Sequence, residues 1–167
     1  MFKHNRIIFF LLLLSSCQSE KDKLLKEGYQ IFEKQKFAIK CPCELKKEPY
    51  PKVADKKNII DYHYTCIMKN EKDENYTQYM VQFLPNKKMN SSELKENREK
   101  FHETMKRDVE SITLTTRNGH EVFFLKYTPH LYSEIYLNPE MTYYINAHGK
   151  NAHKTDDAFF NSVVFLK

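Results

Sequence analysis

Apolar and polar residues alternate with a period of two over most of the chain, a pattern that predicts β-strands. Two polar stretches interrupt it. Residues 42–58, rich in Lys, Glu and Pro, are expected to form a loop, and residues 69–75 are expected to separate an antiparallel pair of strands. The strands predicted in this way are residues 29–33, 36–41, 59–68, 76–84, 112–117, 120–127, 131–137 and 141–147.

One long helix is predicted in the middle of the chain. The sequence Asn90-Ser91-Ser92-Glu93 is a helix-start signal. The apolar residues after it recur at intervals of seven and four, which predicts a helix over residues 91–109; they are Leu94, Phe101, Met105 and Val109. A shorter C-terminal helix is expected where Thr155-Asp156-Asp157 supplies a cap and first-turn acids ahead of residues 158–163.

The dipeptide Asn118-Gly119 predicts a tight hairpin, because both residues of such a turn need a positive φ. With Arg117 opposite His120, two apolar pairs fall on one face of the hairpin: Leu114 with Phe123, and Ile112 with Leu125. We expect the long helix to pack on this face, burying Leu114, Phe123, Leu125, Phe101 and Met105.

Together these elements predict an α+β fold, with an antiparallel β-sheet of about six to seven strands and the long helix and short C-terminal helix packed on it. The chain has 167 residues, of which 41% are hydrophobic and 14% aromatic. This is enough to build one core and excludes a multidomain enzyme. We expect a single α+β domain over residues 29–167.

The N-terminus has the pattern of an export signal. Lys3 and Arg6 precede an apolar run over residues 7–14, which is too short to span a membrane as a helix. The run ends in Leu14-Ser15-Ser16-Cys17, which resembles the lipobox of bacterial lipoproteins. The resemblance implies a signal peptide over residues 1–16, cleavage before Cys17 and lipidation of the Cys17 sulfur. Residues 17–28 would then be a lipidated polar tether holding the domain on the cell envelope, with the outer membrane favoured.

The net charge and the absence of known catalytic motifs limit the functions that we expect. Lys and Arg total 27 against 22 Asp and Glu, and removal of residues 1–16 takes away two basic residues, leaving 25 − 22 = +3. The charges alternate in sign, as on a solvated surface, so nucleic acid is not an expected partner. The chain has no Gly-x-Ser-x-Gly, His-Glu-x-x-His or phosphate-loop motif and only 3 Gly, so we expect no catalytic residues and no cofactor.

Three cysteines remain after Cys17: Cys41, Cys43 and Cys66. In an oxidising compartment we expect one disulfide, joining Cys66 to Cys43 or, less favourably, to Cys41. The alternative is a metal or redox site that also uses His63. In a strand, however, His63 and Cys66 point to opposite faces, so we favour a structural disulfide and expect no metal.

Two further residue types suggest binding chemistry. The tyrosines of the strands could form a platform for a sugar or a peptide, although half-buried sheet packing is the more common role of tyrosine at this spacing. His148 and His153 flank Gly149-Lys150-Asn151 in an expected loop, where solvated histidines are favoured over a metal pair. The tyrosines concerned are Tyr62, Tyr64, Tyr76, Tyr79, Tyr132, Tyr136, Tyr143 and Tyr144.

Two short motifs resemble those of Mog1/PsbP-like domains. Phe37-Ala38-Ile39-Lys40-Cys41-Pro42 is similar to the family's opening F-S-I-x-x-P, and residues 158–163 are similar to its closing F-F-x-S-F helix. The resemblance implies a small antiparallel sheet with packed helices in an accessory or binding protein. We therefore expect a non-enzymatic envelope lipoprotein that binds an envelope protein or a small ligand. The alternative is a thiol- or metal-handling protein that uses Cys41, Cys43 and Cys66.

Overall fold

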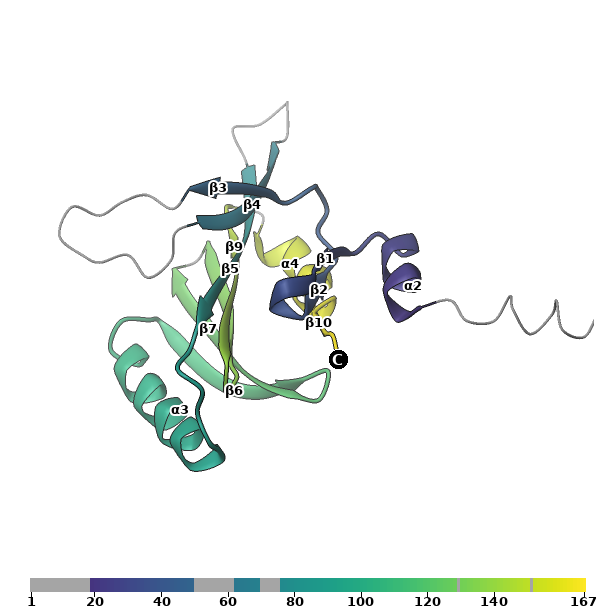
Figure 1. Ribbon diagram of the computed structural model, residues 1–167. Coiled ribbons are helices and arrows are strands. Elements are labelled where there is room, and N and C mark those ends of the chain that lie inside the picture. The colour runs from purple at the N-terminus through teal and green to yellow at the C-terminus, as the bar shows by residue number, and fades with distance from the viewer. Residues whose placement is uncertain (1–18, 50–61, 70–75, 129, 151) are drawn as a thin grey trace, which may run out of the picture.

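A computed structural model describes residues 19–49, 62–69, 76–128, 130–150 and 152–167. The expected signal peptide and Cys17 lie outside the described residues. Ten strands form two antiparallel sheets within the described part (Figure 1). The small sheet has the order β1-β2-β10: Gln30–Phe32, Phe37–Ile39 and Val164–Phe165. The large sheet has the order β3-β4-β5-β9-β8-β7-β6: Lys46–Pro49, Tyr62–Lys69, Tyr76–Pro85, Met141–His148, Leu131–Leu137, His120–Thr128 and Ser111–Arg117.

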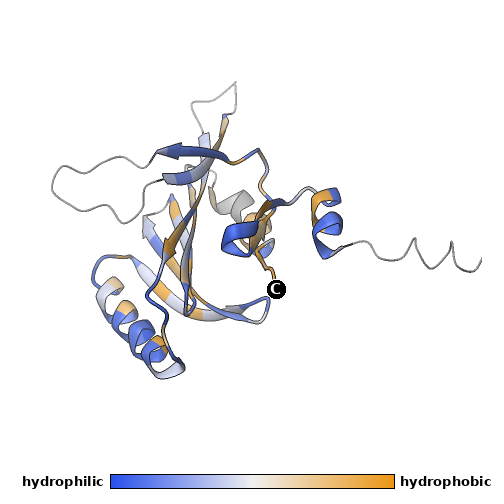
Figure 2. Cartoon of the chain, in the orientation of Figure 1, coloured by the Kyte–Doolittle hydropathy of each residue, from blue (hydrophilic) through white to orange (hydrophobic). Residues whose placement is uncertain are grey.

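The main core lies between the first face of the large sheet and a layer made of the small sheet and helix α4 (Ala152–Asn161) (Figure 1). Aromatic residues dominate this core, and Phe37, Tyr79, Tyr136 and Phe159 are almost completely buried. The ring of Phe37 stacks on Tyr143, with centroids 5.3 Å apart, which ties β2 to β9. Figure 2 shows hydrophobic residues concentrated in strands of the sheets, while helix α3 is mainly hydrophilic. The expected α+β class is confirmed.

Helix α3 (Ser91–Met105) packs on the second face of the large sheet, away from α4 (Figure 1). Asn90 and Glu93 form a reciprocal capping box at its start, as the sequence signal predicts. The helix ends at Met105, four residues before the expected end. Phe101 and Met105 are only half-buried, and no residue of the helix is fully buried.

The predicted hairpin is confirmed in its turn and register. Asn118 and Gly119 both have positive φ, at 50° and 80°, and Leu114 pairs with Phe123. Phe123 and Leu125 are buried as expected, but the expected burial of Leu114 is wrong, because its side chain is 49% exposed. Strand β6 is the outer edge of the sheet, and α3 packs chiefly over the neighbouring strands β7 and β8.

Four segments differ from the expected secondary structure, one of them strand β10, which follows the C-terminal helix where no strand is predicted. Helix α2 (Glu20–Lys26) occupies part of the expected tether; Ser19 caps it and Leu24 is buried. Strand β3 lies within the expected loop 42–58 and pairs with β4. Helix α4 begins at Ala152, so Thr155-Asp156-Asp157 lies inside the helix rather than at its cap. Among the described residues, no helix is long and apolar enough to cross a membrane. A short 3-10 helix, Glu33–Gln35, joins β1 to β2.

Candidate functional site

The second face of the large sheet is divided into an apolar half and a polar half. Helix α3 packs on the apolar half, whose buried residues are Phe123, Leu125, Ile135 and Leu137. The polar half lies farther from the edge strand β6, over strands β5 and β9. It forms a groove of about 350 Å³, lined by Gln78, Met80, Gln82, Tyr127, Leu131, Ser133, Tyr144, Asn146 and His148.

The groove is built by strand register. Three rows cross the sheet from β5 to β9 to β8: Gln78–His148–Leu131, Met80–Asn146–Ser133 and Gln82–Tyr144–Ile135. Side chains at alternate positions of a strand share a face, so each strand contributes residues two apart. Antiparallel pairing of strands distant in sequence then places amides, hydroxyls and aromatic rings side by side.

Hydrogen bonds fix several polar groups at the groove. The Gln78 side-chain amide donates to the Thr65 hydroxyl at 3.0 Å, and that hydroxyl donates to the backbone carbonyl of Tyr79 at 3.1 Å. The Ser133 hydroxyl donates to the side-chain carbonyl of Asn146. The NH2 group of the Asn146 side chain is then left as a hydrogen-bond donor. The groove is therefore partly preorganised.

Among the described residues that line this groove, none is Lys, Arg, Asp or Glu. Burial raises the pKa of both Tyr127 and Tyr144, so both hydroxyl groups remain protonated at neutral pH. The groove thus offers neutral hydrogen-bonding groups beside aromatic rings, which suits an uncharged polar ligand.

A second hollow, of about 610 Å³, lies between α3 and the β6–β7 hairpin. Several of its polar and charged side chains contact one another. Arg98 forms an ion pair with Glu121 and donates to the backbone carbonyl of Leu137 at 3.0 Å, and His102 Nδ1 lies 3.5 Å from Glu103 Oε1. The apolar part includes the exposed Leu114 and the ring of Phe123. Because Arg98 and Glu121 are already paired with each other, this hollow is the weaker candidate for a ligand site.

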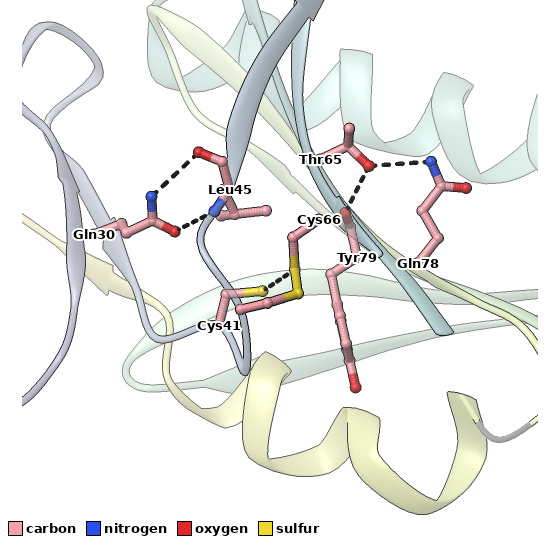
Figure 3. The surroundings of a disulfide bond; sticks show 8 residues. Gln30, Cys41, Leu45, Thr65, Cys66, Gln78 and Tyr79 are labelled. Atoms are coloured by element: carbon pink, nitrogen blue, oxygen red, sulfur yellow. Dashed lines mark hydrogen bonds between the residues drawn. A yellow bond between two sulfur atoms is a disulfide. The ribbon is translucent and has the colours of Figure 1, made fainter. Parts of the chain in front are cut away.

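The cysteines gather where the chain crosses from the small sheet to the large one. A disulfide joins Cys43, on the crossing segment, to Cys66 on β4, with Cα atoms 5.9 Å apart. The side chain of Gln30 holds the same segment: it accepts from the Leu45 amide at 2.7 Å and donates to the Leu45 carbonyl at 3.2 Å (Figure 3). Because β2 pairs in the small sheet instead of with β4, the segment can bend toward Cys66.

Cys41 is a free thiol beside this disulfide. Its sulfur lies 3.1 Å from that of Cys66, and the sulfurs of all three cysteines lie within 4.8 Å of one another. Burial raises the pKa of the Cys41 thiol to about 11, against a smaller lowering by a backbone hydrogen bond from Cys43. The thiol is therefore protonated at neutral pH and is not an activated nucleophile.

His63 does not join the cysteines. It lies two residues from Thr65 on β4, on the face of the groove, while Cys66 faces the core beside Tyr79. In the described part of the chain, these three cysteines are the one group of three or more His, Cys, Asp or Glu residues close enough to hold a metal ion.

The strand tyrosines serve mostly as sheet packing, the role favoured from the sequence over a binding platform. Tyr79, Tyr132, Tyr136 and Tyr143 are buried, and among the tyrosines named from the sequence only Tyr144 lines the groove. His148 ends β9 and lies at the groove, with its ring 5.8 Å from that of Tyr76. His153 falls in α4, and its side chain lies outside the described residues.

Sequence reasoning missed the groove amides, Gln78, Gln82 and Asn146. A signal was present, since these amides occupy alternate positions in otherwise apolar or aromatic strands. The period-two pattern marks them as one face of each strand, but only the strand order brings the faces together.

Comparison of the chain with protein-family models, with curated proteins and with solved structures found no match. Function is therefore inferred from the side chains and their arrangement.

Proposed function

We propose that this protein is a non-enzymatic, lipid-anchored protein of the bacterial cell envelope that binds a neutral saccharide in the groove over β5, β9 and β8. The observation that carries the proposal is the lining of that groove: neutral amides, hydroxyls and aromatic rings on a rigid sheet. An accessory role of this kind also agrees with the resemblance to Mog1/PsbP-like domains.

The chemistry of the lining favours a saccharide. A sugar ring presents hydroxyl groups at its edge and C–H groups on its face. The half-buried amides of Asn146 and Gln78 can hydrogen-bond to sugar hydroxyl groups, while the ring of Tyr144 offers an apolar surface with a polar end. The described residues of the lining include no Lys, Arg, Asp or Glu, which disfavours phosphorylated or strongly charged ligands.

The anchor is the proposed lipid on Cys17. One residue, Gln18, separates Cys17 from Ser19, which caps α2. The lipid would therefore hold the domain close to the bilayer surface. One acyl chain binds a membrane only marginally, whereas a diacylglyceryl group with a further N-acyl chain anchors stably.

Ligand binding can be tested by NMR titration with neutral oligosaccharides, using an N-acetylglucosamine tetramer and maltotetraose as probes. We expect the largest shifts at the side-chain amides of Gln78, Gln82 and Asn146. Asn146→Ala should weaken binding by about tenfold, because an amide that makes two hydrogen bonds contributes about 1–2 kcal/mol. The matched control is Asn97→Ala on exposed α3, which should not change affinity.

Shifts confined to residues outside the groove, or equal losses in both asparagine variants, would contradict the proposed site. Binding of a neutral peptide in place of both sugars would keep the groove but overturn the saccharide class. The anchor is tested separately: Cys17→Ser should abolish the lipid mass and release the protein from the detergent phase. Unchanged mass and partitioning would contradict lipidation.

A further inference from the structure

We propose that, after reduction of the Cys43–Cys66 disulfide, Cys41, Cys43 and Cys66 form a three-sulfur binding site for a soft metal cation, of which Cu(I) is the best match. Oxidation would close this site, because the disulfide occupies two of the three ligands. The site is independent of the saccharide groove, since Cys66 faces the core and the groove lies on the other face of the sheet.

The first support is convergence. Three metal–sulfur bonds of about 2.3 Å around one ion place the sulfurs about 4 Å apart in a triangle. The sulfurs already lie within 4.8 Å of one another, and Cys41 is 3.1 Å from Cys66. Loss of the disulfide allows Cys43 and Cys66 to separate, so small side-chain movements are enough to reach this spacing.

The second support is the direction of Cys41. Figure 3 shows the Cys41 sulfur at the side of the disulfide. It does not lie on the extension of the S–S bond. Thiol–disulfide exchange proceeds by attack of a thiolate on a disulfide sulfur, with the other sulfur leaving on the far side. The resting arrangement suits three ligands that share a central ion better than it suits exchange.

The fold holds each ligand in place. Cys66 lies in the central part of β4 and is 6% exposed. The amide and carbonyl of Leu45, two residues beyond Cys43, are held by Gln30, and the amide of Lys40, next to Cys41, donates to the Ser162 hydroxyl at 2.9 Å. These contacts anchor the crossing segment on both sides of the cysteines without using the disulfide itself.

The ligand set favours Cu(I). Thiolates are soft ligands, which bind Cu(I) and Zn(II), but structural Zn(II) almost always takes four ligands. Within the described residues no fourth His, Cys, Asp or Glu joins the three sulfurs, and His63 lies on the opposite face.

The chemistry requires a dithiol reductant. The dithiol transfers two electrons and two protons to the Cys43–Cys66 disulfide, becomes a disulfide itself, and leaves three thiols. Cu(I) then displaces one proton from each thiol that binds it. No oxidation state of the metal changes in this sequence.

The test uses the full chain in detergent, with Cys17→Ser in every sample so that the cluster contains the only cysteines. Protein reduced with dithiothreitol, then freed of it anaerobically, is titrated against a coloured Cu(I)–chelator complex. We expect one Cu(I) transferred per reduced chain, with sulfur-to-copper charge-transfer absorption, and none per oxidised chain. Cys41→Ser should weaken binding at least about tenfold, because even outer-shell changes at metal sites cost 10–100-fold.

Met89→Leu is the matched control, since it removes a sulfur in the segment before α3, outside both proposed sites, and it should leave Cu(I) affinity unchanged. Wild-type affinity in Cys41→Ser, transfer to the oxidised chain, or uptake of Zn(II) but not Cu(I) would each overturn the proposal. If reduction unfolds the chain, Cu(I) should restore the near-ultraviolet circular dichroism of the oxidised protein. Failure to restore it would overturn the proposal as well.

Discussion

The Cys43–Cys66 disulfide should stabilise the fold, and Cys41 should replace Cys43 when Cys43 is removed. The two bonded residues are 23 positions apart. In the chain-entropy relation, closing a loop of that size lowers the entropy of the unfolded chain enough to stabilise the fold by about 3.4 kcal/mol. A Cys41–Cys66 loop is two residues longer, so its contribution is about the same.

Replacement is expected because the Cys41 sulfur lies 3.1 Å from that of Cys66 and is free. Cys43→Ser should therefore form a Cys41–Cys66 bond and lose no more than about 1 kcal/mol of unfolding free energy, mainly through local strain. Cys66→Ser and the double variant Cys41→Ser/Cys43→Ser have no such partner. Each should lose about 3 kcal/mol.

Urea unfolding under non-reducing conditions measures these differences, and non-reducing peptide mapping identifies the bonds. Cys41→Ser, which keeps the native pair, is the matched control and should unfold like the parent protein. With reductant present, all variants should converge on the stability of the double variant. If Cys43→Ser loses as much as Cys66→Ser and retains two free thiols, Cys41 does not reach Cys66 and the reasoning is refuted.

Three further predictions concern the core, one turn and the free thiol. Phe123→Ala should lower the unfolding free energy by about 3 to 5 kcal/mol, whereas Leu114→Ala should lower it by less than about 1 kcal/mol, because Phe123 is 3% and Leu114 49% exposed. Urea unfolding measures both losses, and equal losses would contradict the packing of α3 on Phe123. Gly149→Ala should lower the melting temperature, because Gly149 has a φ of 134° and an added Cβ would collide with the backbone carbonyl of Tyr76; an unchanged melting temperature would contradict that contact. Alkylation of Cys41 should accelerate about tenfold per pH unit and level off near pH 11, because burial raises its pKa to about 11 and thus keeps the thiol protonated below that pH. Mass spectrometry measures the alkylation rate, and a rate that levels off below pH 9 in the folded protein would contradict the raised pKa of Cys41.

Much of the strand and hairpin structure could be predicted from the sequence, because local chemistry determines it. Asn118-Gly119 specifies the turn, and the turn then fixes the pairing of Leu114 with Phe123. Burial could not be predicted in the same way. It depends on where α3 lies, and α3 packs beside the edge strand β6 and leaves Leu114 exposed.

The missed elements lack the patterns used to find strands and helices. Strand β3 has the sequence Lys-Lys-Glu-Pro and is fully exposed, so no apolar alternation marks it. It is an edge strand, where charged residues and proline are tolerated. Helix α2 has only 7 residues and one buried side chain, Leu24, which is too little for a periodic signal.

The cysteine cluster could be predicted in composition but not in geometry. The sequence favours a bond from Cys66 to Cys43 over one to Cys41, but a regular hairpin between β2 and β4 would place Cys66 far from both. The division into two sheets removes that conflict: β2 pairs with β1 and β10, so the crossing segment is free to approach β4. Non-local strand order, which the sequence pattern does not encode, therefore decides the environment of all three sulfurs.

The same strand order explains why the second face of the sheet has an uncovered groove. Strands β7 and β8 supply Phe123, Leu125, Ile135 and Leu137, and burying these residues favours packing of α3 over them. Strands β5 and β9 instead present Gln78, Gln82 and Asn146 on this face, and covering neutral amides without new hydrogen bonds is unfavourable. A helix of 15 residues is about 22 Å long, so α3 is too short to extend over every strand of a seven-stranded sheet. The position of the groove thus follows from which strands carry apolar residues, and the half-buried amides of Gln78 and Asn146 remain accessible for the proposed ligand.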